Sequence, residues 1–186
     1  SYGEYLDSVQ SLKPALNIVG LAGHSAIRFE AMGDKSMDEG VQATPSELEH
    51  IKRLVKESVE EGAVGFSTSR FLGHHVPDGR LTPGTWADLN ETRAIQQAII
   101  DGGGAGGLFQ VAPDMASRRE IEFEMFKTGA ELGCHVMYSG GAGGNGDGGV
   151  GRTAQFLDKM NEGGRRMTSV CHTRPSGAMF GLAQST

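Results

Sequence analysis

Short runs of apolar residues alternate along the chain with segments in which apolar residues recur every three or four positions. The first pattern is typical of strands buried in a parallel sheet, and the second is typical of helices that cover such a sheet. Together they predict about five strands, placed at residues 16–22, 63–67, 107–111, 135–139 and 167–171. A helix is predicted between successive strands, and this strict alternation indicates an α/β protein with a parallel sheet.

The predicted helices carry boundary signals. Capping boxes are expected where a hydroxyl residue stands three positions before an acidic one, at Thr44 with Glu47, Thr85 with Asp88, and Ser117 with Glu120. Glycines at 62, 102 and 133 offer helix ends. The last helix is predicted over about Thr153 to Glu162.

Two architectures fit this order of elements, an open doubly wound sheet and a closed barrel. A complete (β/α)₈ barrel needs at least about 200 residues and eight strands, whereas the chain has 186 residues. We therefore interpret residues 1–186 as a single domain that forms part of a (β/α)₈ TIM-type barrel, an internal segment of a longer chain. The open sheet remains the alternative.

Composition and charge exclude several classes of protein. With 38% hydrophobic and 22% charged residues, the chain is expected to fold into a globular domain. The net charge of -6 argues against a nucleic-acid or anionic-membrane partner. No apolar run is long enough to span a bilayer and no leader signal is visible, so we expect a cytoplasmic protein. Cys134 and Cys171 share no metal or redox spacing and are expected to be buried.

The glycine-rich segment 140–151 resembles two phosphate-binding motifs. Residues 146–153 match a P-loop except that Arg152 stands in place of the lysine, and an arginine does not replace that point charge. Residues 141–146 match the dinucleotide-binding pattern, but the next strand does not end in the acidic residue that would bind the ribose. We interpret the segment as an exposed loop between a strand and a helix.

Polar side chains lie at the predicted carboxyl ends of the strands, where parallel α/β proteins bind their ligands. We predict that four of them line a pocket for a small-molecule substrate: His24, Gln110, His172 and Arg174. Arg174 is the expected partner of a substrate carboxylate, because a guanidinium binds a carboxylate through two parallel hydrogen bonds. Ser67 to Ser69, Asp114 and Ser139 stand at other strand ends.

The histidines do not form a recognisable metal motif. His74 and His75 are adjacent, which rarely lets two side chains share one ion, and His135 begins a strand at the opposite end of the sheet. There is no His-x-His, no HExxH and no Cys/His cluster, so spacing alone does not predict zinc.

Several segments together resemble the N-acyl-D-amino-acid deacylases of the amidohydrolase superfamily. They are residues 1–6, 17–24, 43–48 and 61–68, and residues 174–177 with 181–182 are similar to a less studied branch. The resemblance implies a metal-dependent barrel in which zinc activates a water to attack the amide carbonyl of an N-acyl amino acid. A carboxylate would act as the general base.

Two positions depart from that family. Where the family carries metal-binding histidines after two successive strands, this chain has Ala112 and Gly140, so the zinc ligands are not found. We therefore expect a hydrolase of the amide C–N bond whose catalytic machinery is incomplete in this segment and which is inactive alone. The alternative is a non-catalytic α/β binding or structural domain. Because unpaired barrel edges expose backbone and apolar surface, self-association into a homo-oligomer is expected.

Overall fold

The structure is a computed structural model that describes residues 1–103, 107–140 and 148–170. Its helices are α1 (Tyr2–Ser11), α2 (His24–Met32), α3 (Pro45–Glu60), α4 (Leu89–Asp101), α5 (Arg119–Leu132) and α6 (Gly148–Asn161). Its strands are β1 (Ala22–Gly23), β2 (Gly65–Ser69), β3 (Leu108–Ala112), β4 (His135–Ser139) and β5 (Arg166–Val170). Two 3₁₀ turns, η1 (Gly33–Met37) and η2 (Glu162–Gly164), follow α2 and α6.

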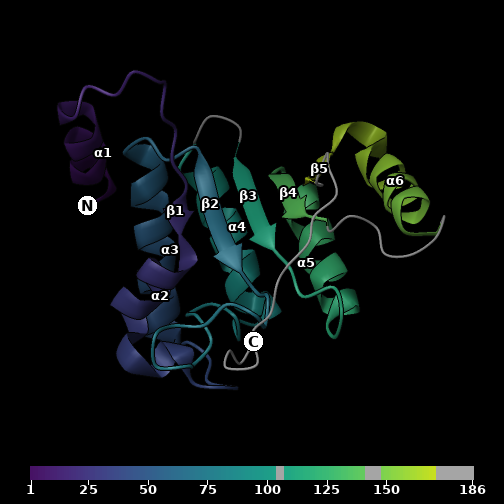
Figure 1. Cartoon of the computed structure of the whole chain (residues 1–186), viewed down its shortest axis with the longest axis horizontal. Coiled ribbons are helices and arrows are strands. Elements are labelled where there is room, and N and C mark those ends of the chain that lie inside the picture. The colour runs from purple at the N-terminus through teal and green to yellow at the C-terminus, as the bar shows by residue number, and fades with distance from the viewer. Residues whose placement is uncertain (104–106, 141–147, 171–186) are drawn as a thin grey trace, which may run out of the picture.

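The strands form one parallel sheet in the order β1-β2-β3-β4-β5, so each strand pairs with the next one along the chain (Figure 1). A doubly wound sheet would instead reverse its strand order at a switch point and carry helices on both faces. The sequential order is the arrangement of a barrel wall, and the sheet is not closed. The predicted partial TIM-type barrel with five parallel strands is therefore confirmed.

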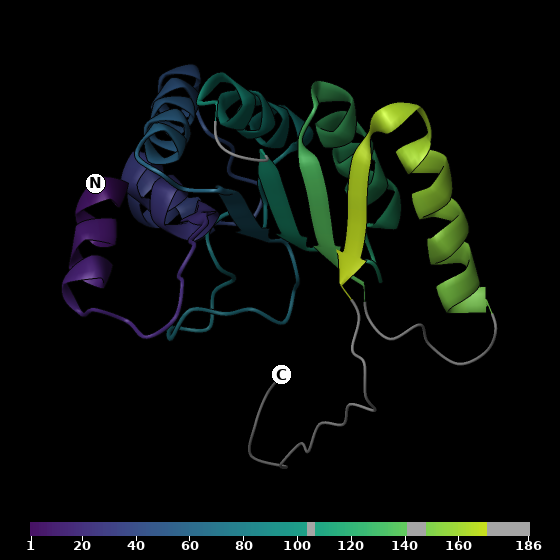
Figure 2. The same ribbon diagram turned by 90° about the horizontal axis from the view of Figure 1, so that it is seen from above.

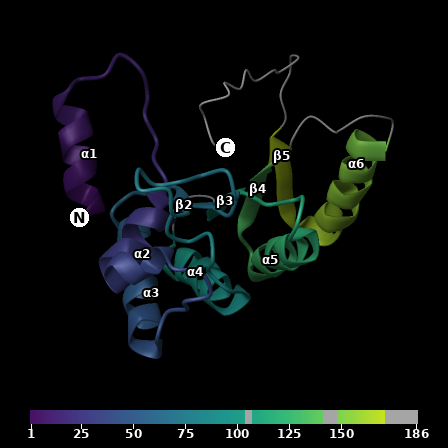
Figure 3. The ribbon, with the colours of Figure 1, turned by 60° about the horizontal axis from the view of Figure 1, so that its bottom comes forward.

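The two faces of the sheet differ. Four side chains in register across β2 to β5 are buried beneath the helices: Phe66, Phe109, Val136 and Met167. Figures 2 and 3 show α3, α4 and α5 together on this side of the sheet. The neighbouring row, Ser67, Gln110, Met137 and Thr168, points the other way because side chains alternate along a strand. No helix of the described residues covers that second face, which we call the helix-free face.

The first predicted strand is wrong in its extent. Leu16 and Val19 are 78% and 75% exposed, and the strand comprises only Ala22 and Gly23. The chain reaches the sheet near Gly20, whose carbonyl accepts a hydrogen bond from the Val64 amide at 3.0 Å. Among the described residues the preceding run has no strand beside it, so its apolar pattern does not lead to pairing.

The predicted start of the first long helix is confirmed. Thr44 caps α3, with Pro45 in the first turn and a reciprocal hydrogen bond between Glu47 and the Thr44 amide at 2.9 Å. Gly62 follows that helix with a φ of 117°, a conformation that favours glycine.

Two other capping predictions are wrong. Asp88, and not Thr85, caps α4 by accepting a hydrogen bond from the Glu91 amide at 2.8 Å. Ser117 does not cap α5, because its hydroxyl donates to Asp114 and the helix begins one residue later. Gly133 ends α5 in the left-handed region, as predicted.

The remaining predictions are resolved in part. Helix α6 begins at Gly148, five residues before the predicted Thr153, while residues 141–147 of the glycine-rich segment lie outside the described residues. Cys134 is buried as expected, and Cys171 also lies outside the described residues. In the described parts of the chain, no helix is both long and apolar enough to cross a membrane.

Candidate functional site

A pocket of about 610 Å³ opens at the carboxyl ends of β3, β4 and β5. Its walls combine apolar and polar side chains, and its lining residues are Phe71, His74, Ala112, Pro113, Asp114, Met115, Ala116, Ser139, Gly140 and Val170. This volume lies in the range of about 300–1,000 Å³ that is typical of small-molecule sites. We call it the carboxyl-end pocket.

The floor of this pocket is the last row of the helix-free face. Ser69 of β2 pairs with Ala112 of β3, and Ser139 of β4 pairs with Val170 of β5. Three of these four residues line the pocket, and Ser69 ends the same row on the side of β2. The predicted location of the site at the carboxyl edge of the sheet therefore coincides with a pocket.

A serine and a histidine meet at the edge of the pocket. Nδ1 of His74 lies 2.6 Å from Oγ of Ser69, and the imidazole packs edge-on against Phe71 at a centroid distance of 5.3 Å. The backbone around His74 is fixed as well, since its carbonyl accepts a hydrogen bond from the Thr82 amide at 3.2 Å. A side chain at Gly73 would come within 2.4 Å of the Phe71 ring, so the glycine leaves room for that packing.

Two arginines hold the loop that carries His74, residues 70–88. Arg70 is buried, donating to Glu122 of α5 at 2.8 Å and to the carbonyl of Ala87 at 2.6 Å. Arg118 donates to the carbonyl of Thr85 at 2.9 Å and to the carbonyl of Arg70. Because these bonds reach both ends of the loop, the geometry of the pocket depends on the start of α5.

Asp114 contributes a fixed carboxylate to the pocket wall. Its side chain accepts hydrogen bonds from the amide of Ala116 at 3.2 Å and from the hydroxyl and amide of Ser117, and Arg118 lies 3.5 Å away. Burial acts to raise the pKa of Asp114, but these hydrogen bonds and the arginine outweigh it and hold the pKa below its usual range. The group therefore stays ionised at neutral pH.

His24 lies on the helix-covered side of the sheet, where it is 1% exposed. Its Nδ1 lies 2.7 Å from Oγ1 of Thr68 and its Nε2 lies 2.8 Å from Glu91. Glu91 also accepts a hydrogen bond from the buried Arg28 at 3.0 Å. Gly84 packs directly against the imidazole, since a Cβ there would stand 2.5 Å from Nδ1 of His24.

The protonation of this network follows from its burial. Burial lowers the pKa of His24, against the opposing pull of Glu91, so the imidazole is neutral and donates from Nε2. Burial acts to raise the pKa of Glu91, but the hydrogen bonds from His24 and Arg28 and the charge of Arg28 outweigh it and lower the pKa. The network thus contains one carboxylate and one guanidinium, whose opposite charges balance.

The four residues predicted to bind substrate do not form one group. Gln110 lies on the helix-free face, where its Oε1 accepts a hydrogen bond from the hydroxyl of Ser67. His24 lies on the opposite side with both ring nitrogens engaged, so these two side chains do not share a pocket. His172 and Arg174 lie outside the described residues. Substrate binding by these four residues stays a prediction.

The residues present do not fit the zinc site that the family resemblance implies. Ala112 and Gly140, at the two expected ligand positions, line the carboxyl-end pocket but offer no side-chain donor. Within the described residues, no group of three histidine, cysteine or acidic side chains could hold a metal ion. We therefore derive no catalytic step through a metal for this segment.

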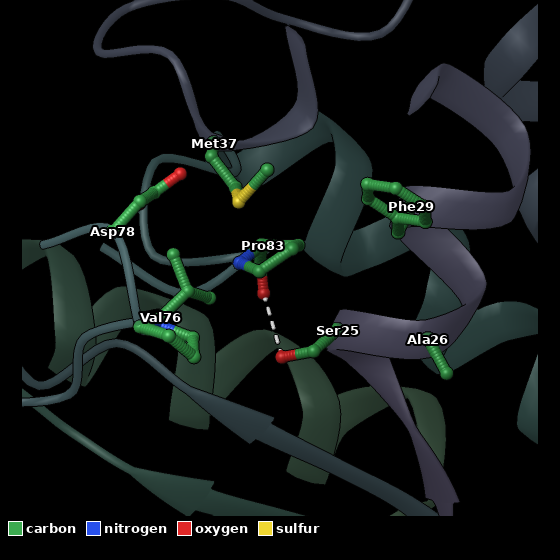
Figure 4. A pocket seen from close by; sticks show the side chains of 8 residues that line it. Ser25, Ala26, Phe29, Met37, Val76, Asp78 and Pro83 are labelled. Atoms are coloured by element: carbon green, nitrogen blue, oxygen red, sulfur yellow. Dashed lines mark hydrogen bonds between the residues drawn. The ribbon is translucent and has the colours of Figure 1, made fainter. Parts of the chain in front are cut away.

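A second pocket, of about 520 Å³, lies between α2 and the loop 70–88 (Figure 4). Apolar groups of Phe29, Met37, Val76 and Pro83 surround it, and Asp78 stands at its edge. The hydroxyl of Ser25 donates to the carbonyl of Pro83 at 3.0 Å and ties the helix to the loop. Its polar groups are thus engaged within the protein.

The sequence did not single out the pairing of Ser69 with His74. The sequence places Ser69 at a strand end and shows His74 as one of two adjacent histidines. The available signal was the turn-rich segment 77–84, which contains two prolines and two glycines and folds the chain back. An antiparallel bridge between His75 and Leu81 marks that reversal.

Comparisons with known proteins find partial similarities to this chain. No family model and no solved structure matches it. An uncharacterized protein of Mycobacterium tuberculosis is 29% identical over 118 residues, which cover 60% of this chain and 19% of that protein.

Two deacylases of Alcaligenes xylosoxydans xylosoxydans are also similar. Its N-acyl-D-aspartate deacylase is 25% identical over 95% of this chain and 33% of its own length. Its N-acyl-D-glutamate deacylase is 33% identical over 34% of this chain and 12% of its own length. The chain thus spans a third or less of the curated relatives it matches. These partial similarities relate it distantly to N-acyl-D-amino-acid deacylases and so to the amidohydrolases.

Proposed function

We propose that this chain forms part of the barrel wall of an amidohydrolase-like enzyme that cleaves the amide C–N bond of an N-acyl amino acid or a related substrate. The observation that carries the proposal is the carboxyl-end pocket, which opens where the last row of the helix-free face meets the loop 70–88. In barrel enzymes the substrate binds at this end of the strands. The partial similarity to deacylases supports the same chemistry.

The helix-free face carries polar side chains, as the interior of a catalytic barrel does. The Ser67 hydroxyl donates to Gln110, and Nε2 of His135 lies 3.1 Å from Oγ1 of Thr168. A face meant to pack against a second layer of helices would instead be apolar. We assign Gln110 to substrate binding, because it lies on the helix-free face, which would line the space that the barrel encloses.

The other predicted residues take different parts in the proposal. Arg174 would bind the substrate carboxylate and His172 would stand beside it, since both follow β5 in the sequence. His24 would position β1 and β2 through Thr68 and Glu91. The zinc ligands and the general base would come from other parts of the protein. The cytoplasmic location also stays a proposal.

The test uses the protein translated from the complete reading frame that contains this chain. It would be incubated with N-acetyl derivatives of D- and L-amino acids, with and without added Zn²⁺, and release of the free amine would be measured. We expect turnover, and we expect Gln110→Ala to lower kcat/KM by about tenfold, the worth of one hydrogen bond.

The matched control is Gln97→Ala, because Gln97 is an α4 residue whose side chain donates to Asp101 at the surface, at 2.8 Å. This change should leave kcat/KM unaltered. If none of the N-acyl amino acids is hydrolysed under either metal condition, the proposed activity is wrong.

A non-catalytic domain that self-associates is the second candidate function. The observation in its favour is the apolar stretch before β1, where Leu12, Leu16, Ile18 and Val19 are each more than half exposed. A second copy of the chain could cover these side chains. Light scattering on the 19.7 kDa chain would then give twice that mass, whereas a monomer at high concentration would exclude this function.

A further inference from the structure

We propose that Ser69 and His74 form a nucleophile–base pair that transfers an acyl group covalently at the edge of the carboxyl-end pocket, which His74 lines. Nucleophilic serines are recognised by a base within about 2.6–3.2 Å of the hydroxyl, and here the Oγ to Nδ1 distance is 2.6 Å. This chemistry is independent of a metal and of whether the acyl donor is an N-acyl amino acid.

The tautomer of His74 sets the direction of this hydrogen bond. A neutral imidazole has one N–H donor and one acceptor nitrogen, and a serine hydroxyl carries a single proton. With the proton of His74 on Nε2, Nδ1 accepts the Ser69 proton. Nδ1 is then the atom that removes this proton when Oγ attacks a carbonyl carbon.

The neighbouring serine shows why Ser69 is distinctive. The hydroxyl of Ser67, two residues earlier on the same face, donates to the amide oxygen Oε1 of Gln110. An amide oxygen is a poor base, so it cannot take up the proton that a nucleophilic attack releases. Only Ser69, of these two hydroxyls, faces a group that can act as a general base.

The pair is held in place before any ligand binds. Ser69 is fixed in β2 by its pairing with Ala112, and the next amide, that of Arg70, donates to the Ala112 carbonyl at 2.8 Å. On the other side, the amide of His74 donates to the carbonyl of Phe71 at 3.1 Å. Such preorganisation reduces the entropy that would be lost on reaching the reactive geometry.

The pocket walls indicate the class of acyl donor. Phe71, Pro113, Met115 and Val170 present apolar surface beside His74, which suits an acyl group with an apolar chain. The carboxylate of Asp114 lies in the same lining and would repel an acidic acyl group. The expected substrates are therefore esters or amides of uncharged, apolar carboxylic acids.

The reaction balances without a further reactant except water. Oγ of Ser69 bonds to the acyl carbon, its proton moves to Nδ1 of His74, and the bond to the leaving alcohol or amine breaks as that group takes the proton. Water then attacks the acyl-serine while His74 accepts its proton, and the carboxylic acid is released with the Ser69 hydroxyl restored.

The test is covalent labelling of the protein translated from the complete reading frame with an alkyl fluorophosphonate, followed by peptide mass mapping. We expect the adduct on Ser69, and we expect His74→Ala to slow labelling by about 100-fold, as loss of a positioned base does. Ser8→Ala is the matched control, because the Ser8 hydroxyl bonds only within α1. An adduct on another residue, or labelling of Ser69 that is as fast in His74→Ala, would overturn the proposal.

A second variant tests His74 as the base without the fluorophosphonate. Ser69→Cys preserves the shape of the side chain, and His74 should promote ionisation of the introduced thiol. Iodoacetamide should then alkylate it about tenfold faster than in the Ser69→Cys/His74→Ala double variant. Equal rates in the two variants would contradict a role for His74 as the base.

The two proposals fail in different ways. If Ser69 is labelled while no N-acyl amino acid is hydrolysed, the serine chemistry stands and the proposed amidohydrolase function is wrong. If N-acyl amino acids are hydrolysed while the fluorophosphonate leaves Ser69 unlabelled, the amidohydrolase function stands and the serine chemistry is wrong.

Discussion

Nε2 of His24, the first residue of α2, lies 2.8 Å from the carboxylate of Glu91 in the first turn of α4. Both side chains are almost fully buried, although 67 residues separate them in the sequence. Arg28 supplies the compensating positive charge. This contact joins the first and second strand–helix units and is the basis of the first two predictions.

Glu91→Ala should lower the free energy of unfolding by about 3–5 kcal/mol, because it leaves the buried Arg28 without its counter-charge. Urea unfolding followed by circular dichroism would measure the loss. Glu57→Ala is the control, since it breaks an exposed ion pair with Arg53 at 3.1 Å and should cost about 0.5 kcal/mol or less. Similar losses in both variants would show that the buried network does not stabilise the fold.

Acidification should destabilise the protein through His24. Because burial lowers the pKa of His24 below its ordinary value of 6.5, the unfolded chain binds a proton at a higher pH than the folded one. The contribution of the neutral His24 to the free energy of unfolding is therefore complete above pH 6.5 and falls as the pH drops below it. In the variant His24→Asn, the free energy of unfolding should depend less on pH between about pH 7 and pH 5, the range in which histidine titrates. Urea unfolding at a series of pH values would measure this dependence. An unchanged pH dependence would contradict this prediction.

Glu47 should contribute a second, more acidic transition. Its hydrogen bond with Lys35 and those with Thr44 lower its pKa from 4.5 to about 2. The stabilisation is complete above pH 4.5 and is lost as the pH falls toward 2. At neutral pH, Glu47→Ala should cost about 1 kcal/mol, the usual worth of a helix cap. Glu47→Gln, which keeps the capping geometry, should cost less; an equal cost would assign the effect to charge alone.

Gly84→Ala should destabilise the fold by about 1–3 kcal/mol, since it combines a strained backbone with a steric overlap. Gly84 has a φ of 99°, and a Cβ there would stand 2.5 Å from Nδ1 of His24. Gly79→Ala is the matched control, because its φ is 91° but no atom lies within 4 Å of the added Cβ. Thermal unfolding should separate the two variants, and equal shifts would show that the overlap with His24 is unimportant.

Cys134 should resist alkylation in the folded protein. It is fully buried, and burial raises the pKa of its thiol to about 12, so the reactive thiolate is scarce. Mass mapping after iodoacetamide treatment should find Cys134 modified only in denaturant. Modification under native conditions would indicate that the α4–β3–β4 region opens readily.

The sequence predicted an element correctly where the apolar residues of that element itself account for its burial. Strands β2 to β5 were predicted within one or two residues of their observed positions, because side chains such as Phe66 and Val136 are apolar and lie under helices. The cap at Thr44 was equally local. Helix α2 was missed because its buried face includes Arg28, whose partner Glu91 is remote in the sequence.

The sequence predicted where the candidate site lies but not which residues form it. Parallel strands put their carboxyl ends at one edge, so a site there followed from the order of elements. Which side chains meet at that edge depends on how the loop 70–88 folds, and its geometry is set by Arg70 and Arg118 reaching carbonyl groups. No local pattern in the sequence encodes those bonds, and so the contact of Ser69 with His74 was not foreseen.

The order of the strands has a consequence for how the chain acquires its structure during synthesis. Each of the strands β2 to β5 pairs with the strand made just before it, so its hydrogen-bonding partner is already present when it is synthesised. Contacts that are close in sequence form quickly, and a nascent chain folds from its amino-terminal side. The sheet can therefore grow by one strand–helix unit at a time as the chain leaves the ribosome. At each step the most recent strand provides the edge with which the next strand pairs.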